Sequence, residues 1–390
     1  MVKRQTVLAF GAAALIGCGL AAAKADPLMV IGNDEKLLWD DSGKAVIHEN
    51  GKDSVVVVDI ANPENPKIVA TLPLKNSVIG PPVNIDISPN GAIALVSDSI
   101  NVTKDGETLK NSPDDKVYVI DLKAKPAKLI NTLTVGKQPS GLSFNRAGTL
   151  ALVANRADKS ISVLSVNGTE VKVVGTVPTD DIVSHVTFTP DGKRALATKF
   201  NNHKVTVLSV DGEKVTYDKK NDLPTGLWPY NVAVSPNGQI ALTADNGDSG
   251  NSDGSVDTVS VVDLTLSPPR IIDRVVVGDG PEGLAISPKG DLAVAAILAG
   301  SNNKSAYFYH RNGHLAILKI DGKKVTKIKD VEVGGLPEAV MFSPDGKYLY
   351  AGNYLDQDVS ILKVNGTDVV NTGKKLKLPG HPASGRMSAK

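Results

Sequence analysis

After residue 26, short stretches in which apolar and polar residues alternate follow one another along the chain, each bounded by Gly, Pro, Asn or Asp. Alternation with a period of two is typical of β-strands that bury one face. Beyond the first 25 residues, no run has apolar residues at helical spacing. The pattern therefore predicts an all-β chain built from many short strands.

A recurring turn divides these strands into units. Its clearest form is Ser-Pro-Asn-Gly at 88–91, and its degenerate copies are Asn145–Gly148 and Asp40–Gly43. Proline at the second turn position presets φ, and glycine accepts the positive φ that ends the turn. We expect one such turn between the first and second strands of every unit. The seven turn glycines are Gly43, Gly91, Gly148, Gly192, Gly238, Gly290 and Gly346.

Each unit continues with a third and a fourth strand. Four of the third strands end in an Asx-Gly pair, such as Asn167-Gly168, which is a strong signal for a hairpin. Four strands per unit and seven units predict a seven-bladed β-propeller of four-stranded antiparallel blades. We expect Leu28–Gly32 to pair with the last blade and close the ring, with closure by the tail around Pro379–Pro382 as the alternative. The predicted third strands are Val55–Ile60, Val117–Leu122, Ser160–Val166, Val205–Val210, Val259–Leu264, Leu315–Ile320 and Val359–Val364.

The repeat has the form Gly-x-x-Pro-x-Gly-x-x-x-Ser-Pro-Asp-Gly, followed by Ala-Asn and Ser-Val-x-Val. Gly278–Val294 and Gly334–Asn353 are its closest copies, and Leu152–Asn155 is nearest to the tetrapeptide Tyr-Val-Thr-Asn. The chain thereby resembles the YVTN-type bacterial β-propeller repeat family over nearly its whole length after residue 26. This resemblance implies the propeller fold, and it is compatible with surface proteins, lactonase-like enzymes and quinone- or haem-dependent dehydrogenase subunits.

The first 25 residues have the features of a secretory signal peptide. Lys3 and Arg4 precede an apolar stretch, and Ala23–Ala25 supplies a small-x-small cleavage site. We therefore expect a signal peptide at 1–25, a single propeller at 26–390, and a periplasmic or secreted protein without a transmembrane span in its mature form. Leu15–Cys18 also resembles a lipobox, which leaves a lipoprotein anchored through Cys18 as the alternative.

Composition narrows the range of functions. The formal net charge is +1, so no nucleic-acid footprint is visible over the whole chain. A single cysteine excludes an intramolecular disulfide and multi-cysteine metal sites. Phe, Trp and Tyr make up 4% of residues, which argues against an aromatic-rich carbohydrate groove. The nucleophile elbow Gly-x-Ser-x-Gly, a covalent-haem motif and a phosphate-binding loop are absent from the sequence, so no motif compels an enzyme assignment.

Three loops between second and third strands are longer than the repeat requires: 97–116, 245–257 and 299–313. In a propeller these loops share one face with the connections between blades, and insertions on one face point to function. The 299–313 loop carries an aromatic cluster that can form a ligand lid or a partner contact, or can simply pack on itself. The predicted ligand-binding residues on this face are Trp228, Tyr230, Tyr307, Tyr309, His310, Arg311 and Tyr354.

The 245–257 loop concentrates carboxylates among glycines. Calcium prefers several oxygen ligands on a flexible loop, although this spacing is not that of an EF-hand. A solvated flexible loop is the alternative. No other metal or cofactor is evident from the sequence. The weak candidate ligands for Ca²⁺ are Asp245, Asp248, Asp253 and Asp257.

Equivalent positions in the repeats are expected to form a ring around the mouth of the central channel. Ser140, Tyr230, Glu282 and Glu338 follow or lie close to the connecting proline, and Asp98, Arg156, Lys199, Asp245 and Tyr354 end second strands. Such mixed groups can bind a polar small molecule or a side chain of a partner, and they can equally neutralise one another in water. The resemblance to seven-bladed lactonases implies that His185, Glu282, Glu338 and Arg156 or Lys199 would surround a lactone carbonyl, supplying a base and an oxyanion-stabilising cation.

The sequence therefore favours an exported binding or scaffold module that holds a protein, polymer or small polar ligand through its loop-rich face. A lactonase-like hydrolase with its active site at the channel mouth is the first alternative. An accessory subunit of a periplasmic redox enzyme is the second, and it predicts a large exposed apolar patch.

Overall fold

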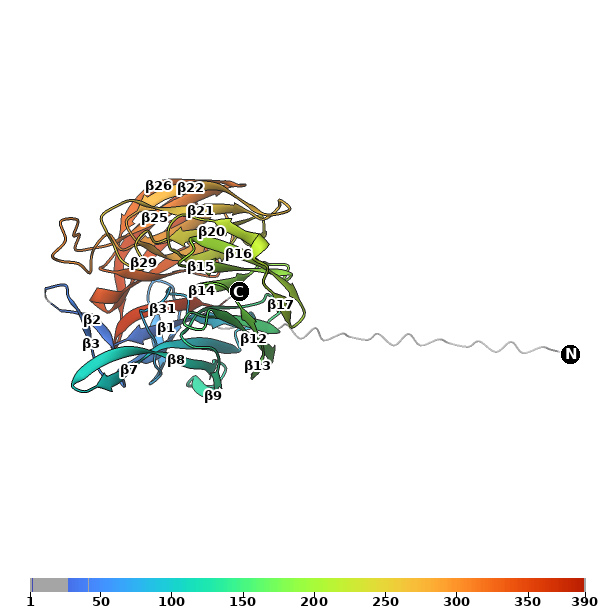
Figure 1. The fold of residues 1–390 in the computed structure, drawn as a ribbon, viewed down its shortest axis with the longest axis horizontal. Coiled ribbons are helices and arrows are strands. Elements are labelled where there is room, and N and C mark those ends of the chain that lie inside the picture. Colours follow the sequence, from blue (N-terminus) through green and yellow to red (C-terminus); the bar gives the residue numbers. More distant parts are fainter. Residues whose placement is uncertain (1, 3–26, 41, 389–390) are drawn as a thin grey trace.

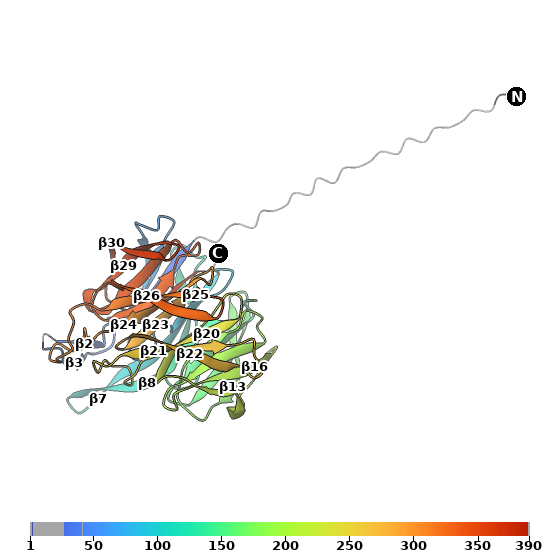
Figure 2. The same cartoon turned by 90° about the horizontal axis from the view of Figure 1, so that it is seen from above.

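The computed structural model describes residues 2, 27–40 and 42–388. Within this part of the chain, seven antiparallel sheets are arranged as the blades of a β-propeller (Figures 1 and 2), which confirms the predicted fold. Its only helical segments are two single 3₁₀ turns, Lys219–Asn221 and Tyr354–Asp356, so no described helix is long and apolar enough to cross a membrane. The predicted signal peptide and Cys18 lie outside the described residues.

Each blade orders its four strands from the channel outwards. The first blade is β31 (His381–Met387), β1 (Leu28–Asp34), β4 (Ser54–Asp59) and β5 (Lys67–Leu72); the second is β6 (Ile85–Ile87), β7 (Ile93–Asp105), β8 (Thr108–Asp121) and β9 (Lys128–Thr134); the third is β10 (Pro139–Phe144), β11 (Leu150–Asn155), β12 (Ser160–Asn167) and β13 (Glu170–Pro178).

The remaining blades repeat this order. The fourth is β14 (Val183–Phe188), β15 (Arg194–Lys199), β16 (Lys204–Asp211) and an outer strand split into β17 (Lys214–Thr216) and β18 (Asp222–Pro224); the fifth is β19 (Pro229–Val234), β20 (Ile240–Asp245), β21 (Asp257–Asp263) and β22 (Arg270–Gly278); the sixth is β23 (Pro281–Ile286), β24 (Leu292–Ile297), β25 (His314–Asp321) and β26 (Lys324–Glu332); the seventh is β27 (Pro337–Phe342), β28 (Tyr348–Asn353), β29 (Asp358–Asn365) and β30 (Asp368–Lys377).

The hydrophobic core lies between neighbouring blades. Leu242 and Val261 of the fifth blade, for example, pack with Ala295 and Leu318 of the sixth in one buried cluster. The alternating pattern of each middle strand therefore fills two interfaces, one on either side of its sheet. A closed ring gives every blade two neighbours, which explains why residues on both faces of the middle strands are buried.

The first blade joins the two ends of the chain. β1 pairs with β4 on one side, where Ile31 faces Val56, and with β31 on the other, where Ile31 faces Gly385. Figure 1 shows the red β31 beside the blue β1. The expectation that Leu28–Gly32 pairs with the last blade is therefore wrong, and closure by the C-terminal tail is confirmed.

This closure corrects the number of turns between first and second strands, which is six among the described residues and not seven. Six of the seven predicted glycines end turns between first and second strands, but Gly43 does not. Its amide donates to the Asp40 carbonyl at 2.9 Å in a hairpin inserted into the first blade. In the closing blade the chain ends replace the turn: the Ser388 amide donates to Leu28 O at 2.8 Å, and the Leu28 amide donates to Ser388 Oγ at 3.0 Å. Ser88 makes the same two bonds with Ile93 within an unbroken turn.

The inserted hairpin consists of β2 (Leu37–Trp39) and β3 (Ala45–Ile47) and lies between the second and third strands of its blade. It is a fourth expansion of the loop-rich face, which we define as the side carrying the loops between second and third strands. The hairpin and the tip of the β7–β8 ribbon project from the same side in both views (Figures 1 and 2). The Ser-Pro-Asx-Gly turns define the opposite side, the turn face.

Candidate functional site

Four polar side chains from four blades form a cluster at the end of the channel nearest the loop-rich face. Tyr230, Glu282 and Glu338 each follow the proline that opens an inner strand, and Arg156 follows the end of β11. Tyr230, Glu282 and Glu338 are 5%, 4% and 2% exposed. We call these four residues the mouth cluster. Their repeat positions were sufficient to predict that they belong to one ring.

The two glutamates of the mouth cluster interact with each other. Burial raises the pKa of Glu282 to about 8, although the interaction with Glu338 and the charge of Arg156 act in the opposite direction. Burial and the neighbouring Glu282 charge raise the pKa of Glu338 well above its usual range. Two buried carboxyl groups in contact cannot both ionise at low cost, so the pair retains a proton at neutral pH.

Arg156 lies over an aromatic surface. Its guanidinium carbon is 5.2 Å from the centre of the Phe200 ring and 5.6 Å from that of Tyr230, and Trp228 stacks on Phe200 at 5.1 Å. Arginine gains from such contacts because its charge faces the negative faces of the rings. Three polar atoms here are buried and have no hydrogen-bond partner in the part of the chain that the structure describes: Arg156 Nε, Arg156 Nη1 and Glu338 Oε2. The mouth cluster thus presents unused donors and an acceptor.

The mouth cluster is covered from the loop-rich face. A Cβ atom on Gly80 would lie 2.6 Å from Ser140 Oγ and 3.5 Å from Arg156 Nη1, so the 75–82 connection passes directly over these groups. The β2–β3 hairpin adds an apolar layer, in which Trp39 meets the Tyr354 ring edge-on at 5.6 Å. Tyr354 is fully buried, and its hydroxyl donates to Leu37 O at 2.6 Å. Tyr354 therefore holds the cover in place and is not exposed for ligand contact.

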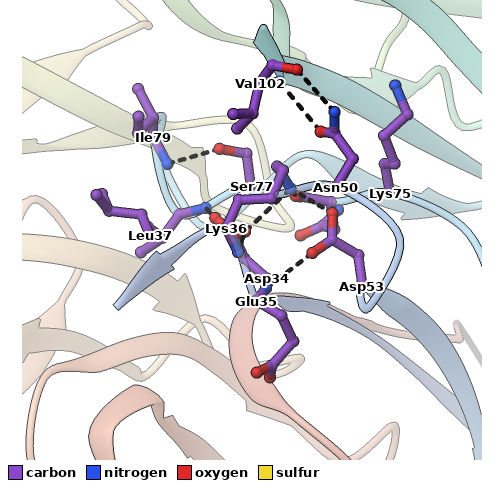
Figure 3. A network of polar contacts seen from close by, with 12 residues as sticks. Asp34, Glu35, Lys36, Leu37, Asn50, Asp53, Lys75, Ser77, Ile79 and Val102 are labelled. Atoms are coloured by element: carbon purple, nitrogen blue, oxygen red, sulfur yellow. Dashed lines mark hydrogen bonds and ion pairs between the residues drawn. The ribbon is translucent and has the colours of Figure 1, made fainter. Parts of the chain in front are cut away.

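A buried lysine ties this cover to the first blade. Lys36 is 1% exposed, and its ammonium group donates to Asp34 at 2.9 Å and also to Asp53 and the Asn76 carbonyl (Figure 3). Burial lowers the pKa of Lys36, but the charges of Asp34 and Asp53 outweigh this effect and leave it raised. Asn76 belongs to the connection that crosses the channel, so one ammonium group links the hairpin, the blade and that connection.

Two of the residues implied for a lactonase site lie apart from the mouth cluster. Lys199 points between blades, where its ammonium group donates to Tyr217 at 2.9 Å and pairs with Asp180 and Asp222 at 2.5 Å each. These partners raise its pKa despite burial. His185 lines a different cavity, which includes none of the mouth cluster. The structure therefore groups Glu282 and Glu338 with Arg156, and it separates them from His185 and Lys199.

The 299–313 loop separates two open cavities on the loop-rich face. The first, of about 220 Å³, is lined by Trp39, Tyr309 and Arg311, and Arg311 also pairs with Asp356 at 2.5 Å. The second, of about 500 Å³, is lined by Phe308 and His310 together with His314, Asp330 and Glu332. Tyr307 lines neither of them; 92% of its surface is exposed, and its ring packs edge-on against Phe308, which lines the second. Tyr309, His310 and Arg311 thus line cavities, whereas Tyr307 projects into solvent.

Two of the four acidic candidates for calcium are held by hydrogen bonds within the protein. Asp245 is buried and accepts hydrogen bonds from Thr243, Thr258, Ser260 and the Gly226 amide, while burial raises its pKa to about 6. Asp257 accepts from the Gly280 amide at 2.9 Å, and burial raises its pKa to about 7. Among the described residues, no three His, Cys, Asp or Glu side chains are grouped to hold a metal ion. The remaining two candidates, Asp248 and Asp253, lie in the loop itself.

Several residues that the structure places in these interactions were not predicted from the sequence. Phe200 supplies the platform for Arg156, and only its place at the end of a second strand pointed to it. Lys36 lies in an insertion without a counterpart in other repeats. Arg386 belongs to β31, whose sequence lacks the turn that marks the other inner strands.

Comparison with known proteins supports a bacterial β-propeller. The family described as Choice-of-anchor I domain matches residues 35–185, which extend from the first blade into the fourth. No curated protein matches the chain. The more specific resemblance to YVTN-type repeats stays a prediction.

Solved structures of similar shape share little sequence with this chain. A Bacteroides uniformis protein provisionally assigned as a 6-phosphogluconolactonase has a TM-score of 0.71 at 16% identity, covering 93% of this chain and 100% of its own. The periplasmic gluconolactonase of Pseudomonas aeruginosa has a TM-score of 0.69 at 16% identity, with coverages of 93% and 99%. Hydrazine synthase of Kuenenia stuttgartiensis has a TM-score of 0.57 at 19% identity, with coverages of 74% and 78%. At these identities the likeness concerns the fold alone.

Proposed function

We propose that this chain is an exported binding module that holds a partner protein through its loop-rich face, with the 299–313 loop at the centre of the contact. The observation that carries the proposal is the exposed Tyr307 ring on a loop whose other residues line two open cavities. An exposed aromatic ring beside cavities with charged and polar linings is the arrangement that anchors protein contacts. The match to the Choice-of-anchor I domain family is consistent with a protein located outside the cytoplasm.

Apolar side chains around this loop extend the proposed contact surface. Val256 and Leu227 are 69% and 56% exposed, and both lie on loops of the same face. The two loops of the fifth and sixth blades touch, since a Cβ on Gly254 would lie 2.7 Å from the Phe308 ring. The Leu227 carbonyl accepts a hydrogen bond from the Gly247 amide, which links the connection that carries Leu227 to the 245–257 loop. A partner can therefore cover the exposed side chains of Tyr307, Val256 and Leu227 without rearrangement of the blades.

Capture of a partner from the native envelope fraction tests this proposal. We expect wild-type protein to recover a partner, and Tyr307→Ser to weaken its binding by at least tenfold, because an interface aromatic contributes about 2 kcal/mol or more. Leu266→Ser is the matched control, since Leu266 is 40% exposed on a turn between third and fourth strands, away from this surface. Equal binding by wild type and Tyr307→Ser, or recovery of no partner, would contradict the proposal.

Lactone hydrolysis is a second candidate, favoured by one observation: a buried carboxyl pair with raised pKa values lies near an arginine with unused donors. In such chemistry the ionised carboxylate would activate water, and Arg156 would stabilise the oxyanion. The lactonase names of two similar folds are consistent with this candidate. The cover formed by the β2–β3 hairpin and residues 75–82 would have to open to admit a substrate.

Glucono-δ-lactone is a suitable substrate for the test. If the candidate is correct, the enzymatic rate, corrected for spontaneous hydrolysis, rises with pH towards about 8, because the base form of Glu282 is then populated. Glu282→Gln and Arg156→Gln should each lower kcat/KM by a factor of about 100 or more. Arg146→Gln, an exposed position on the turn face of the same blade, should have no effect. A wild-type rate equal to the buffer rate would refute this candidate.

A further inference from the structure

A separate cavity, which His185 lines, lies in the central channel at the end near the turn face. It has a volume of about 270 Å³ and is lined by inner strands of the fourth to seventh blades and by β31. Pro236 and Pro288, from two Ser-Pro-Asx-Gly turns, form part of its rim. None of the mouth cluster lines it, and neither does the 299–313 loop. We call this cavity the channel pocket.

Two buried polar side chains that line the channel pocket have atoms without hydrogen-bond partners. His185 is 2% exposed, and its Nδ1 accepts a hydrogen bond from the Val232 amide at 3.2 Å. Burial and the nearby charge of Arg386 lower the pKa of His185 to about 3, so the ring is neutral and its proton is on Nε2. Among the described residues, that Nε2 atom has no hydrogen-bond partner, and neither do Oδ1 and Nδ2 of Asn231, which is fully buried.

Arg386 adds a charged donor at the same place. Its Nε donates to Asp86 Oδ1 at 2.7 Å, and its side chain is 35% exposed. Asp86 is otherwise occupied, because its Oδ2 accepts from the Phe144 amide at 2.8 Å and its Oδ1 also accepts from the Ile87 amide at 2.9 Å. The two terminal nitrogens of Arg386 donate to no acceptor among the described residues. The guanidinium is therefore fixed in position with donors still available.

Most of the other residues that line the wall are apolar, and they include Leu284, Met341 and Phe342; Thr187 and Ser287 add polar groups. A buried polar group without a partner costs about 1–3 kcal/mol, and native proteins contain few of them. Here several such atoms belong to residues that line one cavity, which is smaller than a drug-sized site. From this arrangement we infer that the channel pocket binds a small carboxylate with a short apolar body, its oxygens accepting from Arg386, His185 and Asn231.

Benzoate and its neutral counterpart benzamide distinguish this inference from general apolar binding. We expect saturable binding of benzoate to the full-length protein by ligand-observed NMR and calorimetry, with benzamide at least tenfold weaker. Arg386→Gln and Asn231→Leu should each weaken benzoate by tenfold or more, since a hydrogen bond to a charged group contributes about 1.5–3 kcal/mol. Thermal unfolding of each variant establishes that it is folded, and having two variants guards against the failure of one.

Variants at the other surfaces separate this inference from the proposed function. Tyr307→Ser and Glu338→Gln should bind benzoate as the wild type does, because neither residue lines the channel pocket. Equal affinity for benzoate and benzamide, no binding at millimolar concentration, or benzoate binding that is unchanged in both Arg386→Gln and Asn231→Leu would overturn the inference. A failed partner capture would leave it unaffected.

Discussion

Replacing Lys36 by methionine is expected to lower the free energy of unfolding by about 3–5 kcal/mol, because it leaves two buried carboxylates without their cation. Lys36 is 1% exposed, and Asp34 and Asp53 are 1% exposed in their side chains. Desolvated charges lose water that their partner must replace, so removal of one partner costs more than the pair contributes. Chemical denaturation monitored by tryptophan fluorescence measures the effect, since Trp39 lies in the hairpin that Lys36 anchors and packs against Tyr354.

Lys104→Met is the matched control for this substitution. Lys104 pairs with Glu49 at 2.7 Å, but both side chains are about two-thirds exposed, so loss of this solvent-screened pair should leave the free energy of unfolding nearly unchanged. Adding Asp53→Asn to Lys36→Met removes one of the two buried carboxylates left without a cation, and it should restore part of the lost free energy of unfolding. If Lys36→Met and Lys104→Met have the same stability, the buried network is not what fastens the cover.

Deleting residues 381–390 should abolish cooperative folding. The deletion removes β31, the innermost strand of the first blade, and exposes one edge of β1 as well as the faces of the blades on both sides. An exposed apolar edge favours association with other chains. We expect an aggregated product without a cooperative thermal transition, assessed by size-exclusion chromatography and calorimetry.

A circular permutant provides the control for the deletion. Joining Ser388 to Leu28 through Pro-Asn-Gly-Ala, with new ends at the exposed Gly106, places β31 before β1 in the order that the six other blades use. The Ser388–Leu28 bonds already have the pattern of Ser88 and Ile93, so this turn should form without strain. A deletion that still unfolds cooperatively as a monomer would show that β31 is dispensable.

The fold could be predicted because its signals are local. The Ser-Pro-Asx-Gly turns and the Asx-Gly hairpins set φ within a few residues, and the structure places positive φ at Gly91 and Gly168 accordingly. The prediction that Gly43 ends a turn between first and second strands was wrong for the same reason. A turn has similar residues whether it joins two strands of a blade or lies in an inserted hairpin. Closure of the ring is set by pairing between the two ends, and no local pattern encodes it.

The candidate sites were predictable only as far as the repeat extends. Glu282 and Glu338 occupy equivalent positions, so their convergence followed from alignment of the units. Lys199 ends a second strand as expected, but that register turns its side chain between blades towards Asp222. Lys36 and Arg386 lie in an insertion and a terminal strand, where partners are set by tertiary contacts. Their roles depend on residues 17 and 300 positions away, respectively.

The bond between Leu28 and Ser388 spans 360 positions of the chain, and this span bears on the order of folding. Hairpins such as β12–β13 need only neighbouring residues and can form as soon as they are synthesised. The first blade cannot be completed until the last strand is available, because its innermost position belongs to β31. Contacts between distant segments carry a larger loop-closure cost and are associated with slow folding. We therefore expect ring closure to be a late step of folding, because it requires two segments far apart in the chain to meet.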